Sequence, residues 1–316
     1  MYMRLAVAVW LLLPVAMRVW SQTAPVSIQP PRRDVFDAAL VPDSCPEARQ
    51  PLRVVLLADE KDHGPAGNGL HDYPLWQERW ALLLGGRAAS DATQINLHGP
   101  AVLDASMEDG APGVTVECAS GWPTDEHFAQ ANVIAAFNYL AWTDARKKQV
   151  AEYLGRGGGL VLIHSATWTK PKADQEVADL VGIGGFMRYR HGAVKARIVS
   201  TGHPVCRNLP AALCWDDETY WPPLFPMALK QVTVLAVSDE DGNGDTARQP
   251  QPVFWTYESG RGRVFGCVPG HRAGTFDDPW FRLAVLRGIA WAAGGSPYRF
   301  DRLAPRGARF DGPVKR

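Results

Sequence analysis

The sequence predicts a doubly wound α/β fold, in which helices cover both faces of a mainly parallel sheet. Short continuous apolar runs recur along the chain, and such runs are typical of strands that are buried on both faces. Amphipathic segments with capping residues separate several of these runs, as the crossover helices of such a sheet would. A length of 316 residues and a hydrophobic fraction of 46 % permit one large domain or two small ones.

The first half of the chain alternates predicted strands and helices. An apolar run at residues 53–58 predicts the first strand. Asp72 and Pro74 predict the start of the first helix, which a pair of glycines ends. A second helix is predicted at residues 143–156, between a threonine cap and a run of three glycines. Further strands are predicted at residues 114–118, 132–137 and 160–164.

The second half is predicted to be richer in strands. A final helix is predicted at residues 278–293, because acidic residues at its start favour the helix dipole and two glycines follow its end. Residues 185–230 show little periodicity and are predicted to be rich in loops, which often carry function. Strands are predicted at residues 194–200, 231–237, 253–257 and 263–268.

The two ends of the chain lie outside the predicted domain, which covers residues 52–295. Residues 1–21 are predicted to be a signal peptide, because Arg4 precedes an apolar stretch of about 13 residues that is too short to span a bilayer. We therefore expect a periplasmic or secreted protein with no stable membrane span after cleavage, the alternative being a retained anchor. Residues 22–51 are predicted to form a proline-rich linker, and residues 296–316 a tail without regular structure.

The charge balance and the cysteines narrow the class of protein further. The chain has 33 Lys and Arg and 33 Asp and Glu, so its formal net charge is zero. This balance argues against nucleic-acid binding, which requires a basic surface.

The five cysteines leave at least one thiol unpaired. Cys206 and Cys214 either close a small disulfide loop or remain as two buried thiols, and the sequence leaves both possibilities open.

Histidines follow several of the predicted strands. His63 and His71 lie in the loop after the first strand, and His164 and His271 follow two later strands. The carboxyl ends of parallel strands share one edge, so we expect at least two of His63, His164 and His271 to lie within about 8 Å of each other. Any one of these histidines alone would more often be a solvated or capping residue. Together with Glu218 they predict a site for proton transfer or for a metal ion.

The order and spacing of several short motifs resemble the trehalose-utilisation (ThuA-like) family, over essentially all of residues 52–295. The motifs are VLLADEKDHG from Val55, HDYPLW from His71, GGLVLIHSA from Gly158, HP at His203, DETYW from Asp217, GRGRVF from Gly260 and GH at Gly270. The resemblance implies a three-layer, flavodoxin-like sandwich of the class I glutamine-amidotransferase type. In that fold a cysteine nucleophile occupies a tight turn after a strand. The matching turn here contains His164 and Ser165, so we expect no glutaminase activity.

Two functional hypotheses remain. The first is an enzyme, an isomerase, lyase or hydrolase, that acts on a small-molecule sugar or keto-sugar by acid–base or metal-assisted chemistry. The second is a non-catalytic carbohydrate-binding or scaffold protein on the same fold. In the first, catalysis is assigned to His164, Glu218 and His271. Substrate contacts are assigned to His63, His71, Asp72, Tyr73, His191, Tyr220 and Trp221. A divalent metal such as zinc would be bound by His63, His71 and His164.

Overall fold

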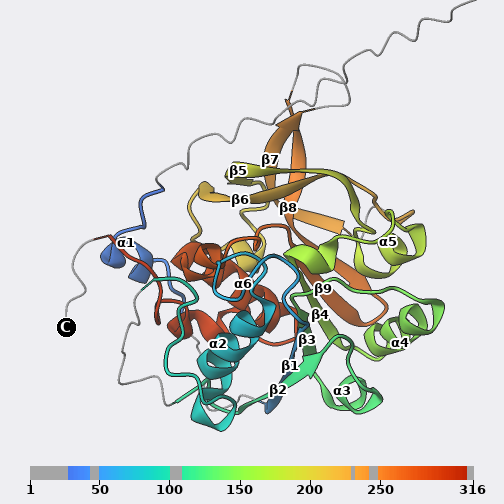
Figure 1. Ribbon diagram of the computed structural model, residues 1–316, viewed down its shortest axis with the longest axis horizontal. Helices are drawn as coiled ribbons and strands as arrows, with labels where there is room; N and C mark the ends of the chain where they lie inside the picture. The colour runs from blue at the N-terminus through green and yellow to red at the C-terminus, as the bar shows by residue number, and fades with distance from the viewer. Residues whose placement is uncertain (1–27, 43–49, 100–108, 229–231, 242–247, 312–316) are drawn as a thin grey trace, which may run out of the picture.

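Within the residues that the computed structural model describes (28–42, 50–99, 109–228, 232–241 and 248–311), the strands form one nine-stranded sheet (Figure 1). The predicted signal peptide and Cys45 lie outside these residues. The strands are β1 Leu52–Ala58, β2 Val114–Ser120, β3 Val133–Ala136, β4 Gly159–Ile163, β5 Phe186–Ile198, β6 Ala212–Pro223, β7 Val232–Asp241, β8 Arg248–Ser259 and β9 Gly262–Cys267. The α-helices are α1 Arg33–Asp37, α2 Tyr73–Gly85, α3 Asp125–Gln130, α4 Asp144–Gly155, α5 Gln175–Val181 and α6 Pro279–Ala292.

The sheet has a parallel half and an antiparallel half. Its strand order is β2-β1-β3-β4-β9-β8-β7-β5-β6. Pairing is parallel from β2 to β9 and antiparallel from β9 to β6. The α/β class is therefore confirmed, whereas a mainly parallel sheet is not. The difference arises between β5 and β9, where successive strands are joined without a crossover helix and parallel pairing requires such a connection.

The prediction of a loop-rich segment at residues 185–230 is wrong. Strands β5 and β6 form a long antiparallel pair in this segment, from Phe186 opposite Pro223 to Arg197 opposite Ala212. Most β5 side chains are exposed or half-buried, and many are charged or polar. The strand therefore lacks the continuous apolar run that marks the buried strands of the parallel half.

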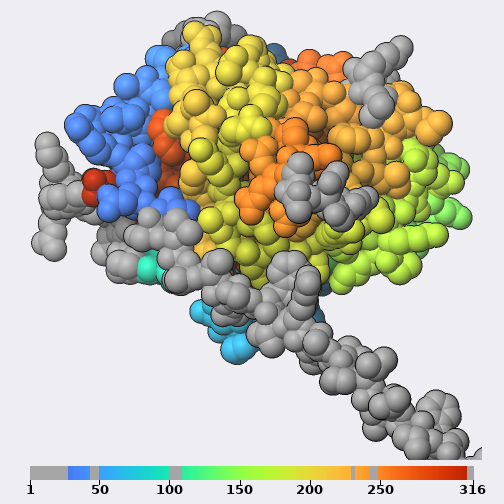
Figure 2. All heavy atoms as spheres, turned by 90° about the horizontal axis from the view of Figure 1, so that it is seen from above, coloured from blue at the N-terminus to red at the C-terminus, as the bar shows by residue number. Residues whose placement is uncertain are grey.

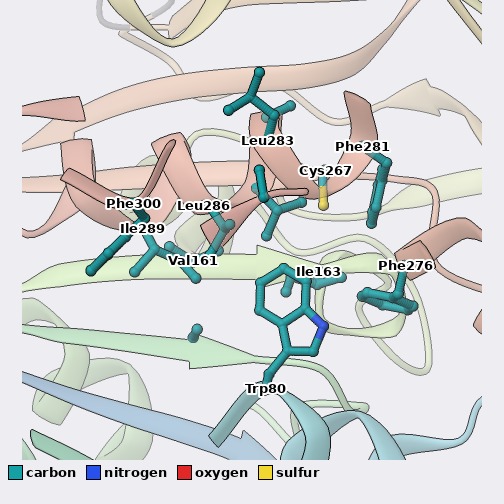
Figure 3. Close-up of a cluster of buried hydrophobic side chains, with 14 of the residues drawn as sticks. Trp80, Val161, Ile163, Cys267, Phe276, Phe281, Leu283, Leu286, Ile289 and Phe300 are labelled. Carbon is teal, nitrogen blue, oxygen red and sulfur yellow. The ribbon is translucent and has the colours of Figure 1, made fainter. Parts of the chain in front are cut away.

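Helices cover both faces of the parallel half. Helices α2 and α6 pack on one face, and α3, α4 and α5 lie on the other (Figure 1). Every residue of α6 is buried, and its core neighbours include Trp80 from α2 and Val161 from β4 (Figure 3). Thr143 accepts a hydrogen bond at the start of α4 and Asp278 does so at the start of α6, whereas the Asp72 side chain makes no capping hydrogen bond at the start of α2. Pattern and caps therefore predicted α2, α4 and α6, whereas the short helices α3 and α5 were not predicted.

Both ends of the described chain pack against the domain. Phe36 in α1 is fully buried, and its ring lies 4.8 Å from the Trp280 ring. Residues 28–42 pack on the surface of the domain (Figure 2). There the side chain of Asn208 donates a hydrogen bond to the carbonyl oxygen of Ala39. A short 3-10 helix, Pro297–Leu303, continues the fold after α6. Regular structure thus extends beyond the 52–295 segment on which the sequence patterns depend.

Two further expectations concern cysteines and membranes. Cys206 and Cys214 are free thiols, so of the two possibilities the disulfide is not formed. Cys206 is buried but Cys214 is exposed, which differs from the expected pair of buried thiols. No helix in the described part of the chain is long and apolar enough to cross a bilayer.

Candidate functional site

Three histidines and one glutamate converge at the carboxyl edge of the parallel strands. We call His71, His164, Glu218 and His271 the histidine–glutamate cluster. One ligand-type atom from each residue lies within 4.8 Å of the others. The Nε2 atom of His71 lies 2.9 Å from Nε2 of His164 and 2.9 Å from Nδ1 of His271. Oε2 of Glu218 lies 3.3 Å from Nε2 of His164 and 3.0 Å from Nδ1 of His271.

His71 is positioned by the loop that follows β1. Its backbone N–H donates to the carbonyl oxygen of His271 at 3.0 Å, so two loops that are distant in sequence are joined at the cluster. Its ring Nδ1 lies 2.8 Å from Oδ1 of Asp62. The other carboxylate oxygen of Asp62, Oδ2, accepts a hydrogen bond from the Tyr73 hydroxyl at 3.1 Å. A carboxylate in this place fixes the ring orientation and directs Nε2 into the cluster.

His164 directly follows β4 and is fully buried. Its Nδ1 lies 2.7 Å from the carbonyl oxygen of Val268, at the end of neighbouring strand β9, and its Nε2 points into the cluster. Both His71 and His164 have left-handed backbones, with φ of 46° and 49°. Residues other than glycine adopt this conformation rarely, and such strain concentrates at functional sites. Two residues of the cluster share this property.

His271 is held by a buried carboxylate that comes from β6. Asp217 is fully buried and accepts hydrogen bonds from the backbone N–H groups of Gly270 and His271, each at 3.0 Å. Arg272 N–H and the Thr275 hydroxyl donate to its other oxygen. A Cβ at Gly270, where φ is 142°, would lie 2.9 Å from the Cβ of His164, so glycine is needed for this close approach.

The antiparallel half supplies the carboxylate of the cluster. Glu218 on β6 lies opposite His191 on β5, and its Oε1 is 3.3 Å from Nε2 of His191. Glu218 therefore faces the cluster with one oxygen and a half-exposed histidine with the other. Tyr220, two residues along β6, stacks against the ring of His164 at 5.2 Å between centroids. The predicted strand at residues 194–200 covers only the end of β5, and β6 was not predicted, although the sequence identified Glu218 itself.

Burial and neighbouring charges set the protonation of the cluster. Burial lowers the pKa of His71 to about 4, although Asp62 opposes this shift. Burial also lowers the pKa of His271. For His164 burial acts in the same direction, but the Glu218 carboxylate outweighs it and raises the pKa. Burial would raise the pKa of Glu218, but its three histidine partners prevail and hold that pKa well below its usual range. At neutral pH Glu218 is therefore ionised and His71 is neutral.

The predicted convergence of histidines is confirmed. The rings of His63 and His271 are 5.4 Å apart, and those of His164 and His271 are 5.6 Å apart. His63 itself is exposed and lies beside the cluster, 4.6 Å from the His71 ring. Of the three residues predicted to bind a metal ion, the cluster contains His71 and His164, whereas His63 lies outside it. Asp62, His63 and His71 form a second, more exposed group of ligand atoms.

Two residues assigned to substrate contacts have other partners. Asp72 pairs with Lys61 at 3.1 Å and accepts the Gly69 N–H, so it stabilises the loop that contains His71. Trp221 donates its indole N–H to the carbonyl oxygen of Asp241 and lies on the face of β6 opposite to Glu218, because successive side chains alternate. Tyr73 and Tyr220 lie against the cluster, as described, and His191 lies at its exposed side.

Sequence reasoning did not identify the supporting roles of Asp62 and Asp217. Asp62 precedes His63 and Asp217 precedes Glu218, so each is adjacent to a predicted site residue. Only the path of the backbone shows that Asp62 orients His71 and that Asp217 holds the loop of His271. Adjacency to a candidate residue was therefore a usable but weak signal.

Neither Cys267 nor Ser165, which lie near the cluster, has the surroundings of a catalytic nucleophile. Cys267 is fully buried in the apolar core beside Ile163 and Phe281 (Figure 3). Burial raises the pKa of the Cys267 thiol, which disfavours the nucleophilic thiolate. Ser165 is buried and its hydroxyl lies 2.7 Å from the Tyr73 hydroxyl. These surroundings differ from those of an activated nucleophile, which has a base within hydrogen-bonding distance.

Aromatic side chains lie on the exposed side of the cluster. Tyr189, two residues before His191 on β5, is 58 % exposed and its ring contacts that of Trp168 at 6.0 Å. Lys170 lies over the ring of Tyr139, which is itself 6.1 Å from the His71 ring. A separate pocket of about 380 Å³ includes Leu70 and Arg272 in its lining but none of the four cluster residues. The cluster is therefore closest to solvent on the side of His63 and His191.

Comparisons with known proteins agree with this fold. A solved structure described as ThuA-like, from Bacteroides uniformis, is 19 % identical, covers 82 % of this chain and 99 % of its own, and has a TM-score of 0.54. A second such structure, from Parabacteroides merdae, is 16 % identical over 78 % of this chain and 92 % of its own, with a TM-score of 0.49. No curated protein matches the chain.

The first of these structures supports the fold alone, because its identity to this chain is low. The sequence profile of the family described as trehalose utilisation (ThuA) matches residues 81–292, which is more than half of the chain. This span includes three of the four cluster residues. The chain belongs to the trehalose-utilisation (ThuA) family.

Proposed function

We propose that this protein is an enzyme that acts on a sugar or keto-sugar, and that the histidine–glutamate cluster carries the chemistry. The observation that carries the proposal is the convergence of three imidazoles and one carboxylate at the carboxyl edge of the sheet, with ligand-type atoms within 4.8 Å of one another. Ligands of open α/β sheets bind at this edge. The description of the family as trehalose utilisation supports a carbohydrate as the substrate class.

Proton transfer next to a carbonyl group is the reaction class that suits these residues. His164 would act as a general base or as a ligand of a metal ion, with Glu218 as its acidic partner at 3.3 Å. A bound metal ion would polarise the carbonyl oxygen of the substrate. Isomerisation and elimination both begin with removal of a proton from the carbon beside a carbonyl. The exposed rings of Tyr189 and His191 offer surfaces on which a sugar ring can stack.

Hydrogen–deuterium exchange in the substrate tests this proposal directly. The protein is incubated in D₂O with disaccharides that have been oxidised to keto-sugars, and NMR follows the C–H beside the carbonyl. We expect enzyme-dependent exchange that falls at least about 100-fold in His164→Ala, since general acid–base catalysis contributes about that much or more. The matched control is His98→Ala, which removes an exposed histidine outside the cluster. Binding of the sugars without exchange or product would contradict the enzyme and favour the non-catalytic binding protein.

We also propose that the protein is exported. The support is the charged and then apolar pattern of residues 1–21. N-terminal sequencing of native protein should find an N-terminus close to Gln22 in the periplasmic or secreted fraction. An intact Met1 in the cytosolic fraction would contradict export.

A further inference from the structure

We propose that His71, His164, Glu218 and His271 bind one divalent transition-metal ion of the zinc class. The inference deepens the proposed function, since it concerns the same site, but its test measures metal binding and needs no substrate. It rests on the orientation of the histidine rings, the spacing of the ligand atoms and the charges around them.

The first argument comes from the hydrogen-bond partners of the two histidines with left-handed backbones. Nδ1 of His164 lies 2.7 Å from the carbonyl oxygen of Val268, and Nδ1 of His71 lies 2.8 Å from the carboxylate of Asp62. Both partners are acceptors, so each Nδ1 donates its proton. In the neutral rings the two Nε2 atoms then carry only lone pairs, and they face each other at 2.9 Å. Two lone pairs at this distance repel, unless a proton or a cation lies between them.

The second argument is the spacing of the four ligand atoms. Ligands about 2.0–2.1 Å from a central zinc ion in tetrahedral geometry lie about 3.3 Å from one another. The cluster shows separations of 2.9 Å for two histidine pairs and 3.0 and 3.3 Å for the two contacts with Glu218. Imidazole nitrogens and a carboxylate oxygen are ligands that zinc and its neighbours in the first transition series accept. The ligand atoms are therefore positioned for one small ion.

The third argument is the surroundings of the ligands. A metal-binding histidine almost always donates its second ring N–H to a carboxylate or a carbonyl. His71 and His164 both do so, through Asp62 and Val268. Glu218 and Asp62 together contribute two negative charges, which balance the charge of a dication in a site where Glu218 is 5 % exposed.

Metal analysis of the full-length protein, purified without a chelator, tests the proposal. We expect about one equivalent of a divalent transition metal per chain by mass spectrometry. After removal of the metal, titration with Zn²⁺ against a chromophoric chelator should show one saturable site. Cobalt should give the visible absorption bands of a four-coordinate ion. A protein that retains no metal and shows no saturable Zn²⁺ site would overturn the proposal and leave a proton-linked network in its place.

Variants locate the site and separate binding from folding. His164→Ala and His271→Ala remove ligands and should abolish the saturable site, with folding verified by circular dichroism. Asp62→Asn keeps all four ligands and should weaken Zn²⁺ binding about 10–100-fold, as loss of an orienting partner does. His98→Ala should bind as the wild type does. Unchanged Zn²⁺ affinity in His164→Ala, His271→Ala and Asp62→Asn would refute the site. The wild-type protein could bind the metal and act on no sugar, while His164→Ala loses the metal. That combination would support the site and contradict the proposed function.

Discussion

The substitution Asp217→Asn tests how the fold holds the loop of His271. The carboxylate is fully buried; Oδ1 accepts the N–H groups of Glu218, Gly270 and His271, and Oδ2 accepts Arg272 N–H and the Thr275 hydroxyl. Asparagine has nearly the same shape. Its oxygen can retain the three contacts of Oδ1, whereas its NH₂ group must then face the Arg272 N–H.

The expected loss of stability follows from these contacts. A hydrogen bond to a charged group contributes about 1.5–3 kcal/mol, and the bonds that remain become weaker when the acceptor loses its charge. One backbone bond is lost and the Thr275 hydroxyl must reverse its role from donor to acceptor. The neutral amide is cheaper to bury than the carboxylate, which offsets part of the loss. We therefore expect a decrease of about 2–4 kcal/mol in the free energy of unfolding.

Urea denaturation of matched variants measures this effect. Thr275→Val removes one hydrogen bond to the same carboxylate and should lower the free energy of unfolding by about 1.5 kcal/mol. The two substitutions act on the same oxygen of Asp217, so the double variant should lose less than the sum. A loss below about 0.5 kcal/mol in Asp217→Asn, the size of an ordinary surface substitution, would refute the reasoning. Additive single effects would also refute it.

Three further predictions concern the cluster, the C-terminal segment and the core. Gly270→Ala should weaken metal binding and activity at least tenfold, because its Cβ would lie 2.9 Å from that of His164; unchanged activity would contradict this. Asp301→Ala should lower the free energy of unfolding by about 3–5 kcal/mol, since it leaves the buried Arg287 without its ion-pair partner at 2.7 Å. Cys267→Ala should lower that free energy by about 1 kcal/mol and leave activity nearly intact; a thousandfold loss of activity without unfolding would support a thiol mechanism.

A matched glycine variant is the control for Gly270→Ala. Gly295 is a suitable position, because a Cβ there would make only an ordinary contact of 3.8 Å with Ala290. Gly295→Ala should leave activity and metal binding unchanged.

Asp301→Ala tests whether the segment after α6 belongs to the cooperative fold. A marginal effect on the free energy of unfolding would show that it does not.

Much of the parallel half of the sheet could be predicted, because a local signal marks most of its longer elements. Strands such as β1 and β4 are buried on both faces and therefore read as uninterrupted apolar runs. Helices α4 and α6 carry a capping side chain at the position where the periodicity begins. The β5–β6 pair has neither signal, since β5 is mostly exposed and a long connection, residues 199–211, replaces the tight turn of a short hairpin.

The histidines of the site were predictable from topology, but the groups that hold them were not. The carboxyl ends of parallel strands lie at one edge of the sheet, independently of the conformation of the loops. His164 and His271 were therefore expected to lie close together. The roles of Asp62 and Asp217 depend on hydrogen bonds between loops, and these loops have no periodicity. Trp221 was predicted to contact substrate because it lies three residues after Glu218. An odd spacing along a strand places the two side chains on opposite faces of β6.

The connections between the two loops explain how the cluster keeps its geometry. Leu70 and Arg272 form an isolated β-bridge, and Ala273 donates a hydrogen bond to Gly69, so the loops of His71 and His271 are paired through their backbones. The Asp217 carboxylate then joins the second of these loops to β6, the strand that supplies Glu218. These bonds fix the relative positions of the two loops and of β6. The left-handed backbone of His71 persists for the same reason, since its own N–H is held by the carbonyl oxygen of His271. A site built in this way should bind its ion without a large rearrangement of the chain.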